Sequence, residues 1–146
     1  MAQGFKLVKE NTDPVYKKVR VASQAYTIGD LVMVQTTADS IDVVPATSSS
    51  TTFGILGVAM ETVTSSATEL LICFVYADQE WSVDCTNTPT VDDNYQKMLL
   101  TNKSVVNNTH TTNTTKEAVF MQTGVVGAAS AKVIVGNILK VANVTA

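Results

Sequence analysis

Few side chains in this sequence could carry proton-transfer chemistry at neutral pH. His110 is the single histidine among 146 residues, and most nucleophile–base pairs that work near neutrality depend on an imidazole. It stands within residues 107–113, an Asn- and Thr-rich stretch typical of an exposed polar loop. We therefore expect His110 to be a surface residue, neither a catalytic base nor a metal ligand.

Two close pairs of carboxylates, Asp78 with Glu80 and Asp92 with Asp93, are the other candidates for chemistry. A glycoside hydrolase needs two carboxyl groups facing each other across a sugar cleft, and a divalent cation needs several oxygen ligands. The chain has one Trp and four Tyr, which offer few aromatic platforms for a sugar. We interpret both pairs as carboxylates that form turns.

Motifs that bind cofactors or activate nucleophiles do not occur in the sequence. The P-loop, dinucleotide-binding, nucleophile-elbow, zinc-protease and EF-hand patterns are all missing. Cys73 and Cys85 are too few for a disulfide framework, and no C-x-x-C pair begins a zinc site. We therefore expect a protein that is not an enzyme and has no cofactor or metal, with two free thiols.

The elements that would position any binding residue are predicted to be β-strands. Val, Ile and Thr together make up about a third of the chain, and β-branched residues favour strands. No apolar run approaches the ~20 residues that span a bilayer, and the first residues lack the apolar core of a secretory signal. We expect a soluble all-β protein made in a cytoplasm.

Two local predictions concern the connections between strands. Residues 70–76 and 81–86 are expected to form a hairpin around a polar turn. This register places Cys73 opposite Cys85 on a wholly apolar face, where a disulfide is geometrically possible. In a reducing compartment we expect the two thiols to be free. The Asn- and Thr-rich residues 102–115 are expected to form a loop.

A weak internal repeat suggests how the strands are grouped. The segments GILGVAMETVTSSATELLICFV and AVFMQTGVVGAASAKVIVGNI share the order strand, small-residue turn, strand. The clearest boundary between them is the turn-rich stretch 87–94. We expect one β domain over residues 22–146, built of two similar β-units at residues 22–86 and 95–141.

Charge is distributed in three blocks along the chain, within a net charge of −3. Residues 1–20 are basic, residues 21–96 contain ten acidic side chains and no Lys or Arg, and the remainder is basic again. The blocks can pair within one molecule or with a neighbour. Residues 1–21 read as an extended arm suited to binding another protein by strand addition and charge pairing. The modest net acidity argues against nucleic acid and membrane partners.

Three short segments are informative when taken together: TIGDLV at 27–32, FGILGVA at 53–59 and KVIV at 132–135. With them the chain resembles the capsid decoration, or cement, proteins of tailed bacteriophages. The family has an arm, a G-D-x-V turn into a strand, an apolar segment that closes with G-V-A, and a terminal β-hairpin. The resemblance covers residues 3–139, and the long Asn- and Thr-rich second half departs from the family pattern.

The resemblance implies a non-enzymatic virion structural protein, made in the host bacterial cytoplasm, that binds the outer surface of the assembled capsid and stabilises it. It implies a compact β-barrel, β-tulip-like or sandwich domain with an extended N-terminal arm. Its expected partners are the major capsid protein and further copies of this chain in a homotrimer. By position, the candidate capsid contacts are Lys6, Lys9, Lys17, Lys18 and Arg20.

Two other functions remain open from the sequence. A different virion component, such as a head fibre base, a neck protein or a tail-tube protein, would also be β-rich and self-associating. A carbohydrate-binding adhesin would use the polar residues 102–115 as its binding loop.

Overall fold

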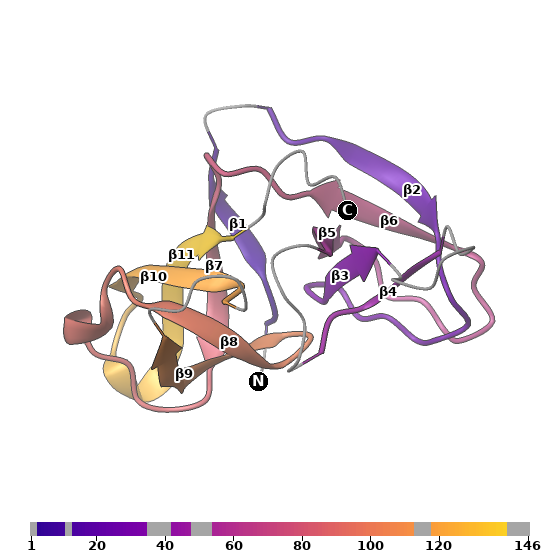
Figure 1. Ribbon diagram of the computed structural model, residues 1–146. Coiled ribbons are helices and arrows are strands. Elements are labelled where there is room, and N and C mark those ends of the chain that lie inside the picture. The colour runs from indigo at the N-terminus through magenta and orange to yellow at the C-terminus, as the bar shows by residue number, and fades with distance from the viewer. Residues whose placement is uncertain (1–2, 11–12, 35–41, 48–53, 113–117, 140–146) are drawn as a thin grey trace.

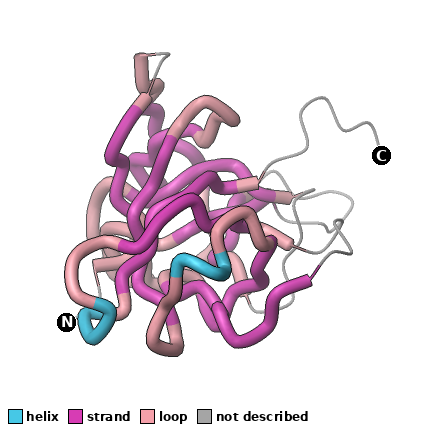
Figure 2. Tube along the Cα trace, turned by 90° about the vertical axis from the view of Figure 1, so that its left-hand side faces the viewer, coloured by secondary structure: helices cyan, strands magenta, loops and turns pink. Residues whose placement is uncertain are grey.

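The computed structural model describes residues 3–10, 13–34, 42–47, 54–112 and 118–139. Strands and their connections make up nearly all of this part of the chain (Figure 2), which confirms the prediction of an all-β fold. Eleven strands and two short 3₁₀ helices occur in the described residues: β1 (Lys6–Lys9), β2 (Tyr16–Arg20), β3 (Leu31–Val34), β4 (Val43–Pro45), β5 (Ile55–Ala59), β6 (Glu69–Phe74), β7 (Glu80–Cys85), η1 (Val91–Asp93), β8 (Lys97–Asn102), β9 (Val105–Thr112), β10 (Phe120–Val125), η2 (Ala129–Ala131) and β11 (Val133–Ile138).

The second half of the chain forms a closed five-stranded barrel. Its strands follow the order β7-β11-β10-β8-β9, with antiparallel neighbours throughout. A parallel pairing of Asp84 with Val105 and of Cys85 with Val106 joins β7 to β9 and closes the barrel. Strand β1 adds to the other half of the same edge of β7, where Lys6 lies opposite Ser82.

The first half forms a five-stranded antiparallel sheet in the order β2-β6-β5-β3-β4. Figure 1 shows β2 lying along β6, with β3 and β4 on the far side of β5. The sheet curls until Val21, directly after β2, forms a parallel bridge with Val43 of β4. The backbone N–H of Ala22 donates to the carbonyl of Val43 at 3.1 Å and strengthens this junction.

The two halves have the same strand topology. In each, the five strands in chain order lie side by side as first, fifth, fourth, second and third, and the first and third meet in parallel. The two repeat segments fall on equivalent elements, β5–β6 and β10–β11. Strand pairing divides the units between β6 and β7, however, and not at residues 87–94, because β7 pairs only with strands of the barrel and with β1.

The predicted hairpin of residues 70–76 with 81–86 is wrong, because β6 and β7 belong to different sheets. The side chain of Gln79 is buried in the connection between them. Its Oε1 accepts the Tyr76 N–H at 2.7 Å and the Trp81 indole N–H at 3.3 Å, and its Nε2 donates to the Phe74 carbonyl at 3.3 Å. Together with a turn in which the Gln79 N–H donates to the Tyr76 carbonyl at 3.2 Å, these bonds stabilise a crossover from one sheet to the other instead of a hairpin.

One hydrophobic core joins the two units. Leu31, Ile55 and Val58 of the first sheet lie in the same buried cluster as Trp81 and Phe120 of the barrel. A second, smaller cluster fills the curled sheet and includes Tyr26, Val32, Leu70 and Ile72. Because the larger cluster spans both units, the barrel and the sheet form one compact domain.

Residues 3–10 and 13–21 carry the strands β1 and β2, and these residues are not an arm separate from the body. Strand β1 pairs with β7, and β2 pairs with β6. Phe5 is 2% exposed, and its ring centroid lies 6.0 Å from that of Phe120. Gly4 has a φ of 67°, and a Cβ there would lie 2.7 Å from the Gly29 carbonyl oxygen. Burial of Phe5 and this close backbone approach fasten the segment to the body.

Candidate partner-binding surface

The residues considered for catalysis are not gathered into a site. The described residues contain no group of three or more His, Cys, Asp and Glu side chains that could hold a metal ion. Asp92 and Asp93 lie in η1, where the Thr90 hydroxyl accepts the Asp92 N–H at 3.2 Å. His110 lies in β9, and its side chain is outside the described part of the structure.

The expected loop at residues 102–115 is largely the strand β9. Thr and Val favour strands. Val106 and Asn108 are both buried, and their spacing of two residues places them on the same face of the strand. The buried Asn108 side chain accepts the Asn87 N–H at 2.8 Å and donates to the Asn87 carbonyl at 2.9 Å. This pairing holds the start of β9 against the residues that follow β7.

Both cysteines are buried free thiols on different sheets. Burial, followed by the nearby Glu10 carboxylate, raises the pKa of Cys73. Burial and then the Asp84 charge raise the pKa of Cys85 to about 11, although Lys132 opposes the shift. Because the thiolate is the reactive form, neither side chain is a nucleophile at neutral pH.

Asp30 of the TIGDLV segment joins the two units. Its carboxylate is 2% exposed, and Oδ2 accepts the Thr27 N–H at 2.9 Å and lies 3.0 Å from Lys103 Nζ. The Lys103 carbonyl accepts the Leu31 N–H at 2.7 Å. The turn between β8 and β9 is therefore bonded to the start of β3, and the G-D-x-V pattern has a structural role here.

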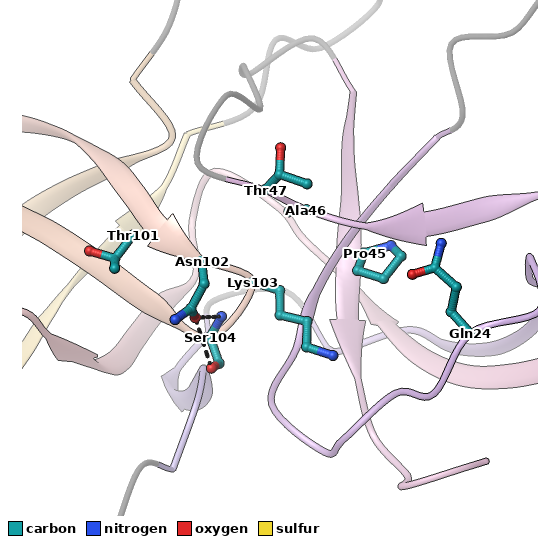
Figure 3. Close-up of a pocket in the computed structure, with 8 residues that line it drawn as sticks. All are labelled: Gln24, Pro45, Ala46, Thr47, Thr101, Asn102, Lys103 and Ser104. Atoms are coloured by element: carbon teal, nitrogen blue, oxygen red, sulfur yellow. Dashed lines mark hydrogen bonds between the residues drawn. The ribbon is translucent and has the colours of Figure 1, made fainter. Parts of the chain in front are cut away.

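A shallow crevice of about 580 Å³ opens beside this junction (Figure 3). Gln24 and Pro45 line one side, and Asn102 and Ser104 of the β8–β9 turn line the other. The Asn102 side-chain oxygen accepts the Ser104 N–H at 2.9 Å and the Ser104 hydroxyl at 3.2 Å. These polar groups of the β8–β9 turn are therefore hydrogen-bonded to each other.

The five predicted contact residues lie on the two strands of the N-terminal segment, and all five are exposed. Arg20 forms an ion pair with Asp42, with 2.8 Å between Nε and Oδ1. Lys9 lies opposite Glu80 across the β1–β7 ladder. The first basic block therefore already has acidic neighbours at two of its five positions.

Lys17 and Lys18 differ from Lys9 and Arg20 in the residues that lie near them. Across the β2–β6 ladder they lie opposite Ile72 and Leu71, which carry no charge. In the described part of the chain, neither lysine is within ion-pair distance of a carboxylate. The positive charge most available to a partner on this segment therefore lies at Lys17 and Lys18, with Lys6 opposite Ser82 as a third exposed cation.

The backbone of β2 also has an open side, which we call the β2 edge and define as the N–H and C=O groups of Tyr16 and Lys18. The Val15 carbonyl accepts the Phe74 N–H at 2.9 Å, and the Val21 N–H donates to the Thr68 carbonyl at 3.1 Å. Backbone groups alternate in direction along an antiparallel strand. The backbone N–H and C=O groups of Tyr16 and Lys18 therefore point away from β6, and no strand in the described ranges pairs with them.

An apolar recess of about 260 Å³ lies between β1, β2 and β6, on the face of the β2–β6 ladder that carries Tyr16 and Cys73. We call it the Tyr16 pocket; its apolar lining is Phe5, Leu7, Tyr16, Ile28, Met60 and Cys73. Tyr16 is 53% exposed and Ile28 is 55% exposed. In the part of the chain that the structure describes, a strand edge without a pairing strand, two lysines without an ion pair and an apolar recess thus occur together.

A scan of protein-family models and a search of curated proteins give no match to this chain. Among the described residues, no helix is long and apolar enough to cross a membrane.

The sequence identified the lysines of this surface but not its arrangement. Tyr16 and Ile28 have no local pattern that predicts their exposure beside a strand edge. The interleaving of Val15, Val19 and Val21 with basic residues was the one available signal, since it indicated a strand with charged residues along it.

Proposed function

We propose that this protein is a non-enzymatic virion structural protein, a decoration protein that binds the outer surface of an assembled phage capsid and stabilises it. The observation that supports this function best is the surface on β2, where, within the described residues, Lys17 and Lys18 form no ion pair and no strand pairs with the outer backbone edge. The partner is then the major capsid protein, which supplies acidic groups and an accessible main chain.

The mechanism of stabilisation is mass action. A protein that binds the assembled shell and not its dissociated subunits lowers the free energy of the shell at every occupied site. An exposed ion pair contributes only about 0–1 kcal/mol, so a few lysines bind weakly at one site. Many copies, or a trimer that engages several subunits at once, raise the total through multivalency.

The attachment of β1 and β2 to the body reduces the cost of this binding. A free arm would lose conformational entropy when it became ordered on a capsid. Here the lysines are carried on strands that are already hydrogen-bonded to β7 and β6. The surface is preorganised, and more of the interaction free energy remains for binding.

The test is cosedimentation of the purified protein with empty expanded shells of the parent phage, prepared without this protein. The variant K17E/K18E reverses two charges, and we expect its dissociation constant to rise by about tenfold or more. The variant K97E/K132E makes the same change in net charge elsewhere and should bind like the wild type. Higher salt should weaken wild-type binding.

Failure of the wild-type protein to sediment with shells at any salt concentration would contradict the decoration function. Assembly of the protein alone into tubes or rings would favour the tail-tube or neck class. The homotrimer belongs to the same proposal, and light scattering coupled to size-exclusion chromatography measures it.

A further inference from the structure

The two units differ at one place in spite of their common topology. In the barrel, the first strand, β7, has two partners along one edge. Strand β9 pairs with its C-terminal half at Asp84 and Cys85, and β1 pairs antiparallel with its N-terminal half at Trp81 and Ser82. The second partner completes the hydrogen bonds of that edge.

The equivalent strand of the first unit, β2, has only one of these two partners. Val21 at its C-terminal end bridges Val43 of β4, just as β7 meets β9. Along Tyr16–Arg20, the described strands include none in the place that β1 takes on β7. Figure 1 shows β1 against β7, and β2 on the outer side of β6.

We propose that the β2 edge accepts an extended acidic segment of a partner protein, which adds to the sheet as an antiparallel strand in the position equivalent to β1 on β7. This inference rests on the proposed function only for the identity of that partner as the capsid subunit. Strand addition supplies affinity through main-chain hydrogen bonds and specificity through alternate side chains.

The charges on β2 favour an acidic partner over a second copy of this chain. Two β2 strands paired edge to edge would bring the Lys17 and Lys18 side chains of both copies close together, and like charges across a ladder are destabilising. Lysines on an exposed edge protect proteins from this self-association. A segment with carboxylates opposite the same lysines gains attraction instead, so one feature rejects one partner and selects another.

The pocket fixes where an apolar side chain would lie in the added strand. Side chains directly opposite each other in a ladder share a face of the sheet. Tyr16 lies opposite Cys73, and both line the Tyr16 pocket. A residue opposite Tyr16 therefore lies on the face of the sheet that carries the pocket and should be apolar, while residues opposite Lys17 and Lys18 should be acidic. In an antiparallel partner these positions read, from N to C, acidic, acidic, apolar.

The direct test uses the synthetic peptide TVEELTV, in which the two Glu lie opposite Lys18 and Lys17 and the Leu lies opposite Tyr16. The control peptide TVKKLTV has the same strand propensity and the opposite charge. We expect the acidic peptide to bind the full-length protein at least tenfold more tightly, measured by fluorescence anisotropy. Equal binding of the two peptides, or none by either, would overturn the proposal.

Amide hydrogen exchange distinguishes strand addition from simple charge attraction. On saturation with TVEELTV, the amides of Tyr16 and Lys18 should exchange at least tenfold more slowly. Lys17 and Val19 are internal controls, because their backbone groups already face β6. Binding that leaves the Tyr16 and Lys18 amides unprotected would refute strand addition.

A proline variant tests the same edge by mutation. K18P removes an N–H that points away from β6, so the β2–β6 ladder stays intact, whereas K18T removes the charge and keeps the N–H. We expect K18P to lose binding more than tenfold and K18T to lose only a fewfold. Circular dichroism and thermal melting check that both variants fold, and the exchange measurement on wild-type protein does not depend on either variant.

Shell binding separates the two proposals. If K18P binds shells as tightly as the wild type, the capsid does not add a strand at this edge, and the decoration function stands without it. If the wild type binds TVEELTV with protected amides but binds no shells, strand addition stands and the decoration function fails. Protection of Tyr16 and Lys18 without peptide, together with self-association in sedimentation, would show that a second copy occupies the edge and would overturn the acidic partner.

Discussion

At the scale of single residues, buried polar side chains determine how the units connect. Asp30 bonds the turn before β3 to the β8–β9 turn of the barrel through Lys103. Gln79 holds the crossover from β6 to β7. Buried polar groups are costly unless they are hydrogen-bonded, so each of these side chains favours the native connection over the alternatives.

The buried thiol of Cys85 makes stability depend on pH above the neutral range. Its pKa is raised from 9.0 to about 11 by burial and by Asp84. Between these values the folded protein keeps a proton that the unfolded chain loses, so the free energy of unfolding falls as pH rises from about 9 towards 11. Below pH 9 both states are protonated and the effect is absent.

Urea denaturation at a series of pH values measures this effect. The variant C85A should show a shallower loss of stability above pH 9 than the wild type. Part of the loss should remain, because burial and the charges of Asp42 and Asp30 also raise the pKa of Tyr26. Identical slopes for C85A and wild type would mean that Cys85 titrates normally in the folded protein.

At the scale of elements, the strands β1 and β2 attach the N-terminal segment to the body and also carry exposed side chains. Alternation along a strand places successive side chains on opposite faces. Leu7 packs against the core cluster, while its neighbours Lys6 and Val8 are exposed. The segment is thereby fixed to the barrel and still presents side chains to solvent.

Two substitutions near β1 distinguish an integral strand from a detachable arm. F5A should lower the free energy of unfolding by about 3–5 kcal/mol, because the ring is buried beside Phe120 and its loss leaves a cavity. V8A, at a side chain that is 54% exposed, should change it by less than about 0.5 kcal/mol. Chemical denaturation of both variants measures the difference, and an equally small effect for F5A would mean that the segment is detachable.

At the scale of the whole molecule, two similar units fold as one body. Both ion pairs found among the described residues, Arg20 with Asp42 and Lys103 with Asp30, join a basic end of the chain to its acidic centre. Pairing within one molecule therefore accounts for part of the charge distribution, and Lys17 and Lys18 retain the charge that a partner could use.

The shared core predicts a single unfolding transition. Leu31 and Val58 of the first unit pack in the same cluster as Trp81 and Ile134 of the second, so neither unit can unfold without exposing apolar surface of the other. Differential scanning calorimetry should give one peak with equal calorimetric and van't Hoff enthalpies. Two resolved peaks would show that the units are independent.

The sequence alone determined the strand content and the exposed lysines, because these properties depend on local composition and alternation. It indicated a repeated strand, turn, strand order, but neither the five-strand topology that the two units share nor the boundary between them. It did not determine that residues 70–76 and 81–86 belong to different sheets. That choice depends on the burial of Gln79 and on partners distant in the chain.

Only the tertiary structure decided which strand edges are filled. The buried side chain of Phe5 holds β1 against the barrel, where β1 pairs with β7. Tyr16 of the β2 edge lines an apolar pocket. Local patterns show that a segment can be a strand, but its neighbours are chosen by the free energy of packing the whole chain. The lysines of β2 could therefore be identified from the sequence, whereas the strand edge beside them could not.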